Sequence, residues 1–139
     1  MNPKISVIIP TFNRRDYLME TIDSILAQPF DSFEILVIDD GSTDGTGQMV
    51  SERYGARVRY VWQVNRGESA ARNLGISMAG GESVAFLDSD DLALPNRLAA
   101  HVRALDSDPN TGMVVGEALL IDSCGDRIIS APLGTGLDA

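Results

Sequence analysis

Cysteine, histidine and lysine each occur only once in this 139-residue chain, as Cys124, His101 and Lys4. A single cysteine provides no disulfide framework, which fits a reducing cytoplasm. Because the only lysine is near the chain start, the sequence has no Gly-Lys-Ser/Thr phosphate-binding loop and no late-strand lysine of a phospho-receiver domain. His101 lies in a predicted helix beside apolar residues and is expected to be partly buried there, without a catalytic role.

Long apolar runs and an excess of positive charge are also missing. The apolar stretches are much shorter than the roughly 20 residues of a membrane span, and the first residues lack a signal-peptide pattern. Eleven Lys and Arg against 20 Asp and Glu give a net charge of -9, which argues against a nucleic-acid partner. We expect a soluble, cytoplasmic segment, although a longer parent protein associated with a membrane stays open. An anionic ligand would need a metal ion as its counter-charge.

Strand-like and helix-like segments alternate along the chain, which predicts an α/β fold with a mostly parallel sheet flanked by helices. A hydrophobic content of 44% supports one folded domain, which we place at residues 1–131. The predicted strands are 5–10, 33–39, 58–63 and 83–87, and the predicted helices are 16–28, 46–54, 68–78 and one that begins at Pro95 and ends at Asp108. Strands at 113–121 and near 127–130 are expected to form a C-terminal hairpin, and 132–139 a linker or tail.

Polar residues follow each of the four predicted strands of the sheet. Thr11 follows the first strand, Asp40 the second, Asn65 the third and Asp88 the fourth. In an open α/β sheet, ligands bind outside the carboxyl ends of the strands. The sequence therefore predicts one site at this edge.

An acidic cluster follows the last of these strands. Asp88, Asp90 and Asp91 place three carboxylates in four positions, and such groups repel one another unless a cation or a hydroxyl-rich ligand lies among them. Alternate residues of an extended loop point the same way. The spacing of Asp88 and Asp90 therefore indicates a metal site, with Asp91 orienting the loop.

Four segments of the chain, Pro10–Arg14, Asp39–Thr46, Asn65–Gly75 and Leu87–Asp91, resemble in order and spacing the family 2 glycosyltransferases of the GT-A fold. The resemblance covers roughly residues 4 to 130. It implies a Rossmann-like fold that binds a nucleotide sugar, transfer of the sugar with inversion to a carbohydrate or lipid-linked acceptor, and a Mn²⁺ or Mg²⁺ ion. It also implies a role in making cell-envelope polysaccharide.

The resemblance assigns roles to three of the acids and to one arginine. Asp90 would ligate the metal that bridges the donor diphosphate, Asp88 would face the ribose or its ordered water, and Asp40 would contact the base. A carboxylate only accepts hydrogen bonds, so Asp40 favours a base edge with an N–H, as in uridine or thymidine, without excluding guanosine. Arg72 would lie near the donor phosphates, or pair with a neighbouring acid.

Other residues of these segments have less specific assignments. Thr11 is expected near the base, Phe12 either stacks on the base or belongs to the core, and Asn65 anchors its loop or contacts the ligand. Asp39 and Asp44 are expected to support the turn and the following helix.

The acceptor half of such an enzyme, with its general base, has no match in the sequence after Ser130. Glu117 and Asp122 do not stand in a context that assigns them as the base. We expect the chain to be the donor-binding part of a longer enzyme, whose uncovered surface would favour a homo-oligomer. The alternative is a non-catalytic nucleotide-sugar-binding module or a degenerate transferase, against which the intact Asp40, Asp88 and Asp90 argue.

Overall fold

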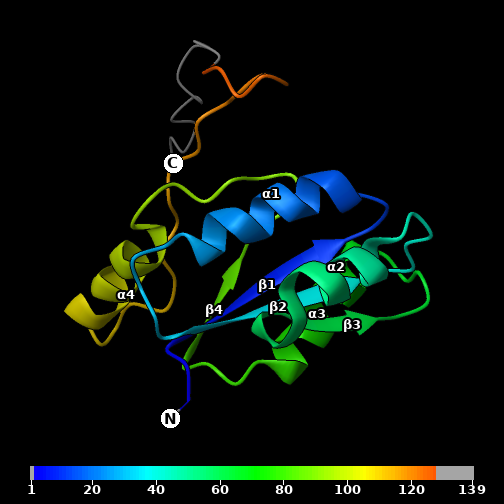
Figure 1. The fold of residues 1–139 in the computed structure, drawn as a ribbon. Helices are drawn as coiled ribbons and strands as arrows, with labels where there is room; N and C mark the ends of the chain where they lie inside the picture. Colours follow the sequence, from blue (N-terminus) through cyan, green and yellow to red (C-terminus); the bar gives the residue numbers. More distant parts are fainter. Residues whose placement is uncertain (1, 128–139) are drawn as a thin grey trace, which may run out of the picture.

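A parallel sheet of four strands in the order β3-β2-β1-β4 organises the computed structural model, which describes residues 2–127 (Figure 1). The strands are β1 (Ile5–Thr11), β2 (Phe33–Asp39), β3 (Arg59–Trp62) and β4 (Ser83–Phe86). Every residue of β1 is buried, which explains its mostly apolar sequence, since a central parallel strand is covered on both faces. Ile5 pairs with Phe33 and Thr11 with Asp39, so β1 and β2 end at the same level.

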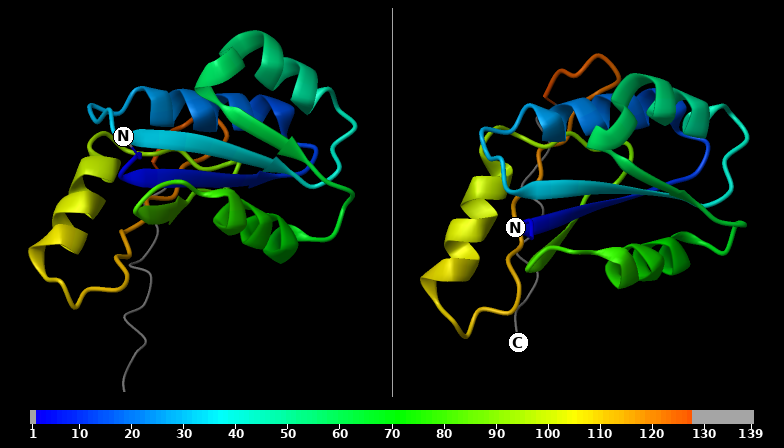
Figure 2. Two further views of the ribbon diagram at one scale, coloured as in Figure 1. Left: turned by 90° about the horizontal axis from the view of Figure 1, so that it is seen from below. Right: turned by 60° about the horizontal axis from the view of Figure 1, so that its bottom comes forward.

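Helices cover both faces of the sheet, as Figure 2 shows. Helices α1 (Arg15–Leu26) and α2 (Thr46–Tyr54, followed by the 3-10 turn Gly55–Arg57) pack on one face, and α3 (Glu68–Met78) packs on the other. Helix α4 (Arg97–Ser107) adds its buried Leu98 to the core of the first face. No helix within residues 2–127 has both the length and the apolar character needed to cross a membrane.

Two separate apolar cores result from this layering. Alternate residues of β1 point to opposite faces, so Val7 lies in the core beneath α1 and α2, while Ile8 lies in the core beneath α3. Gly75 lets α3 approach the sheet closely, because a Cβ atom at this position would lie 2.5 Å from Cγ2 of Ile8. This packing holds the start of α3, and the loop before it, at the carboxyl ends of the strands.

The predicted α/β fold is confirmed: β2, α2 and α3 have the predicted bounds, and the other strands and helices of the sheet layers differ by at most two residues at either end. Helix α1 ends at Leu26 rather than at residue 28, because Pro29 disfavours the helical conformation in the residue before it. Helix α4 begins at Arg97 rather than at Pro95, because Asn96 has the left-handed φ of 65° at the helix start. These shifts leave the order of the predicted strands and helices unchanged.

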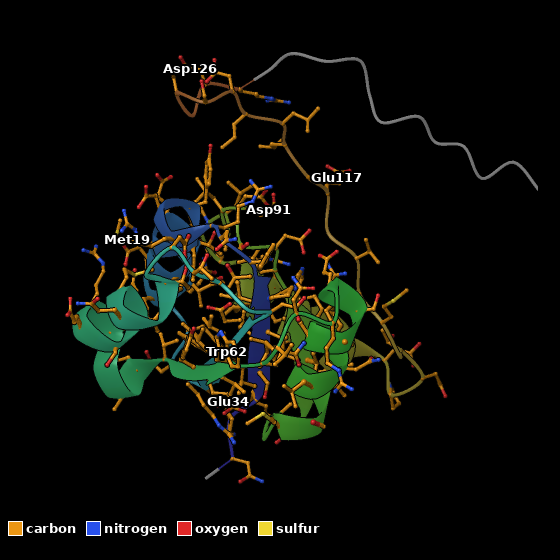
Figure 3. All side chains as sticks on the ribbon, turned by 90° about the vertical axis from the view of Figure 1, so that its right-hand side faces the viewer. Met19, Glu34, Trp62, Asp91, Glu117 and Asp126 are labelled. Atoms are coloured by element: carbon orange, nitrogen blue, oxygen red, sulfur yellow. The ribbon has the colours of Figure 1, made fainter. Side chains whose placement is uncertain are left out.

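The strand predicted over 113–121 is wrong. Within residues 2–127, this segment makes one antiparallel bridge, between Ile121 and Arg127, around a turn in which Asp122 accepts hydrogen bonds from the backbone of Cys124 and Asp126. A two-stranded hairpin alone is marginally stable, and no strand of the described sheet pairs with this segment. Figure 3 shows Glu117 and Asp126 on this segment, away from the sheet. The hairpin residues 128–130, the domain end at 131 and the tail 132–139 lie outside the described residues.

Candidate functional site

A pocket of about 460 Å³ lies at the carboxyl ends of the strands, where the sequence predicted a site. Its lining comes from all four loops that follow the strands: Pro10, Thr11, Phe12, Arg14, Asp40, Asn65, Gly67, Glu68, Ala71, Asp88, Ser89 and Asp90. A larger hollow of about 860 Å³ lies along β4 and α4. None of the predicted site residues lines that hollow, so the smaller pocket is the candidate site.

Asp40 joins two of the loops that form this pocket. It is buried, and its carboxylate accepts hydrogen bonds from Nε2 of Gln63 (2.6 Å) and from the backbone N–H groups of Arg66 (2.8 Å) and Gly67 (2.8 Å). Burial raises the pKa of Asp40, but these hydrogen bonds together lower the pKa below its usual value. Asp40 is therefore a charged acceptor that holds the loop between β3 and α3.

Asp39 and Asp44 support the turn between β2 and α2, as expected. Asp39 is fully buried, and accepts hydrogen bonds from the Ser42 N–H and from the Tyr60 hydroxyl. Asp44 accepts from the N–H of Thr46, the first residue of α2, and from the N–H of Arg15, the first residue of α1. Burial raises the pKa of Asp44, but these hydrogen bonds and the one from the Thr46 hydroxyl outweigh burial and lower the pKa below its usual value. These two carboxylates therefore support the loops that form the site.

Gly41 lets this turn approach the loop between β3 and α3. Its φ is +95°, and a Cβ atom there would lie 3.1 Å from the backbone nitrogen of Asn65. A side chain at this position would both strain the turn and push against the loop. The contact places Asn65 beside the β2–α2 turn, where it lines the pocket.

Asp88 and Asp90 are the open carboxylates of the pocket. Their side chains are 49% and 46% exposed, and each lies next to an arginine. Nη2 of Arg72 is 2.7 Å from Oδ1 of Asp88, and Nη1 of Arg14 is 3.4 Å from Oδ2 of Asp90. Arg72 therefore makes the pairing with a neighbouring acid that the sequence left open as the alternative, and its contact with the donor phosphates stays a prediction.

Asp91 connects the acidic loop to α1. Its carbonyl oxygen accepts a hydrogen bond of 2.8 Å from the Thr21 hydroxyl, and its N–H donates to the carbonyl of Asp88. Partial burial and the charges of Asp88 and Asp90 raise the pKa of the Asp91 carboxyl, although Arg97 opposes them. The backbone of Asp91 makes these contacts, so the role predicted for Asp91 in orienting the loop stays a prediction.

Thr11 and Phe12 end β1 at the pocket wall. Thr11 is 4% exposed, and its Oγ1 is the buried side-chain atom within residues 2–127 that has no hydrogen-bond partner. An unpaired buried hydroxyl is costly, so this atom is suited to a ligand. Phe12 is 48% exposed, which excludes the core position that the sequence left open and keeps base stacking as the prediction.

Arg14, Gln63 and Glu68 belong to the site but were not predicted. Arg14 and Glu68 line the pocket, and Oε1 of Glu68 is 2.6 Å from Nη2 of Arg72. The spacing of Glu68 and Arg72 at i, i+4 on a helix was a signal for this pair. Contacts of Arg14 with Asp90 and of Gln63 with Asp40 join residues far apart in the sequence, so no local pattern indicates them.

A divalent cation fits the pair Asp88 and Asp90 only together with other ligands. Within residues 2–127, no three His, Cys, Asp or Glu side chains are grouped to hold a metal ion. Mg²⁺ is commonly held by one or two carboxylates with substrate phosphates and water. The half-exposed carboxylates at the pocket wall match this arrangement, and they suit an ion that arrives with a diphosphate.

Known proteins similar to this chain are glycosyltransferases. The model of the glycosyl transferase family 2 matches residues 6–130. An uncharacterized glycosyltransferase of Rickettsia felis is 45% identical over 104 residues, which are 74% of this chain and 17% of the relative. This chain thus spans less than a fifth of that relative's length.

Two solved structures share the fold of this chain and are about one third identical to it in sequence. S. aureus TarS 1-349 in complex with UDP-GlcNAc has a TM-score of 0.69 at 32% identity, and the match covers 84% of this chain and 38% of that chain. The mannosyltransferase PcManGT from Pyrobaculum calidifontis, in complex with GDP-Man and Mn²⁺, has a TM-score of 0.72 at 32% identity and covers 81% and 34%. With its GT-A fold and the family match over residues 6–130, the chain belongs to glycosyl transferase family 2.

Proposed function

We propose that this chain is the donor-binding part of an inverting glycosyltransferase that uses a nucleoside diphosphate sugar, most favourably a UDP-sugar, with Mn²⁺ or Mg²⁺. One observation carries the proposal. Six of the seven predicted site residues line a single pocket, namely Thr11, Phe12, Asp40, Asn65, Asp88 and Asp90. The seventh, Arg72, contacts Asp88.

The charge of the pocket supports the use of a metal ion. Four acids line it, Asp40, Glu68, Asp88 and Asp90, against Arg14 in the lining and Arg72 beside it. A free diphosphate would meet a net negative wall, whereas a metal–diphosphate complex carries much less negative charge. The complex is therefore the form of the donor that this pocket favours.

The chain's own residues would hold the donor from its base to its diphosphate. Thr11 and Phe12 lie where the base would bind, with a hydroxyl free to pair and an aromatic face free to stack. Asp90 would hold the cation, Asp88 would face the ribose or its ordered water, and Arg72 would pair with phosphate oxygens. When bound, the ion acts as a Lewis acid that stabilises the charge of the departing nucleoside diphosphate.

Asp40 is the proposed contact for the base, and its hydrogen bonds suggest how the contact would form. A carboxylate has about four acceptor positions, and three are used. Gln63 is the one donor of the three that belongs to a side chain, so it is the one that can turn away. A base with an N–H, such as uracil, would take the free position or replace Gln63.

The general base is expected outside this chain. Neither Glu117 nor Asp122 lines the pocket, and both are exposed on the C-terminal segment. Because the chain spans a small part of its relatives, sugar transfer is proposed for the longer protein, to an acceptor that is a carbohydrate or a lipid-linked sugar. A non-catalytic module would bind the donor equally well, so turnover by the longer protein separates the two functions.

Calorimetric titration of UDP, in Mn²⁺ and in a chelator, tests the donor site. We expect binding that weakens strongly on chelation, and Asp90→Asn should remove most of the metal-dependent part. Asp31→Asn is the control, because Asp31 is an exposed acid that does not line the pocket. Unchanged metal dependence in Asp90→Asn would show that the ligand assignment is wrong.

A further inference from the structure

Each of the two open carboxylates of the pocket, Asp88 and Asp90, already has a cation beside it in the free protein. Arg14 lies 3.4 Å from Asp90 and Arg72 lies 2.7 Å from Asp88. A guanidinium stays protonated at any ordinary pH, so neither arginine can lose its charge to make room. A metal ion that binds these oxygens has to displace the guanidinium groups or bind beside them.

The two arginines differ in what else holds them. Nη2 of Arg72 is also 2.6 Å from Glu68, one turn earlier on α3, so Arg72 keeps a partner when Asp88 is engaged elsewhere. Arg14 lies in the loop between β1 and α1, and its side chain is 50% exposed. Apart from Asp90, the Arg14 side chain lies, within residues 2–127, over the ring of Tyr17, with Cζ 5.8 Å from the ring centroid. Arg14 is therefore the arginine that can move most easily.

We propose that Arg14 occupies the metal position on Asp90 in the free protein and moves to the donor diphosphate when the metal–donor complex binds. This inference rests on the proposed function. It makes Arg14 a positioning residue that couples the binding of the metal to the binding of the nucleotide.

The exchange of ion pairs explains why the coupling is positive. With both ligands present, Asp90 gains the metal and Arg14 gains a phosphate, so the lost pair is replaced by two. With the metal alone, Arg14 loses its partner and remains next to a second cation. With the nucleotide alone, Asp90 stays close to a diphosphate of the same charge. Each ligand therefore improves the affinity for the other by the same factor, as linkage requires.

The expected size of the effect is modest because the groups are half exposed. A single exposed ion pair changes an equilibrium constant by about 1.5- to 5-fold, and the repulsion between a divalent cation and a nearby guanidinium adds to this. We expect Arg14 to supply about 3- to 10-fold of the cooperativity between Mn²⁺ and UDP.

The test measures the affinity for Mn²⁺ with and without saturating UDP, by calorimetry or by the electron paramagnetic resonance of free Mn²⁺. Arg14→Gln should bind Mn²⁺ alone about 3- to 10-fold more tightly than the original chain, and its cooperativity should fall by the same factor. Glutamine keeps a polar side chain without the charge.

Arg15→Gln is the matched control. Arg15 is the next residue, is 48% exposed, pairs with Asp16 and lines a different hollow. It should change the affinity for Mn²⁺ alone by less than about twofold, because its guanidinium pairs with Asp16 and does not line the pocket, and exposed charges that make no direct contact interact weakly. Circular dichroism would confirm that both variants fold as the original chain does.

The outcomes separate this inference from the proposed function. If the original chain binds UDP with Mn²⁺, but Arg14→Gln binds Mn²⁺ alone no more tightly, the inference is wrong and the donor site stands. An equal gain in Arg15→Gln would also overturn it, since general charge would then explain the effect. If the original chain does not bind UDP in Mn²⁺ at all, the proposed function fails and the inference fails with it.

Discussion

Two acidic turns of this molecule look alike in sequence and have opposite environments. After β2, Asp39 and Asp40 are buried and accept hydrogen bonds from the chain itself, two on Asp39 and three on Asp40. After β4, Asp88 and Asp90 are about half exposed and face arginine side chains. The carboxylates of the first turn are thus mostly hydrogen-bonded within the chain, while those of the second pair with arginines that a ligand can replace.

The pKa shifts point the same way. Hydrogen bonds lower the pKa of Asp40 despite the opposing effect of burial, so the first turn favours the charged form. At the second turn, partial burial and the neighbouring carboxylates raise the pKa of Asp91. The crowding of negative charge that raises this pKa would be relieved by a cation. This difference distinguishes the turn after β4, which we propose binds a ligand, from the turn after β2, which supports the loops of the pocket.

The largest expected difference between the turns is in stability. Asp39→Ala would leave the Ser42 N–H and the Tyr60 hydroxyl without their acceptor, which should lower the free energy of unfolding by about 2–4 kcal/mol. Asp90→Ala should change it by less than about 0.5 kcal/mol, because the side chain is half exposed. Urea unfolding of both variants measures the comparison. Similar losses would mean that the two turns are equally structural.

A smaller effect is expected on the choice of nucleotide, through Asp40. Asp40→Ala should lower the affinity for UDP by about 1–3 kcal/mol, the range for an unpaired buried partner, and should reduce the preference for UDP over CDP. Titrations of both nucleotides in Mn²⁺ measure this. An equal loss for UDP and CDP would show that Asp40 only supports the loop, and would place both carboxylates of the first turn in the frame.

The smallest expected effect is the pH dependence of stability, which should have opposite signs at the two turns. The pKa of Asp40 is lowered by folding, so its contribution is present above the unfolded value of about 3.9 and is lost as pH falls through the lower folded value. The pKa of Asp91 is raised, so its contribution is present below about 3.9 and is lost as pH rises through the higher folded value.

Urea unfolding between pH 3 and pH 7 tests these signs with two variants. Asp40→Asn should show a weaker loss of stability on acidification than the original chain. Asp91→Asn should gain stability relative to the original chain as the pH rises above about 4, because the unfavourable charge is gone. Parallel pH profiles for the original chain and both variants would contradict the contrast between the turns.

The outline of the fold was predictable from local patterns. Strands such as β1 and β2 are mostly apolar because both of their faces are covered, and glycine, proline and polar residues mark the turns between elements. The segment 113–121 has similar apolar residues but no strand. An apolar pattern in one segment favours a strand, but the strand forms only where a second segment supplies the backbone hydrogen bonds of a sheet.

The sequence predicted which residues form the site better than it predicted the contacts between them. Parallel strands place their carboxyl ends at one edge, so Thr11, Asp40, Asn65 and Asp88 were expected to converge there, and they line one pocket. The pairing of Arg14 with Asp90 was not predicted, since these residues are 76 positions apart and only the tertiary structure brings them together.

The sequence by itself determined the order of strands and helices, the edge of the sheet that carries the site and the presence of two acidic turns there, because these follow from local apolar patterns and from the geometry of parallel strands. Only the tertiary structure decided which turn has buried, hydrogen-bonded carboxylates and which has half-exposed ones. The burial of a carboxylate and the donors around it depend on chain segments that are distant in sequence, so Asp39 and Asp40 are buried and hydrogen-bonded while Asp88 and Asp90 are half exposed at the pocket wall.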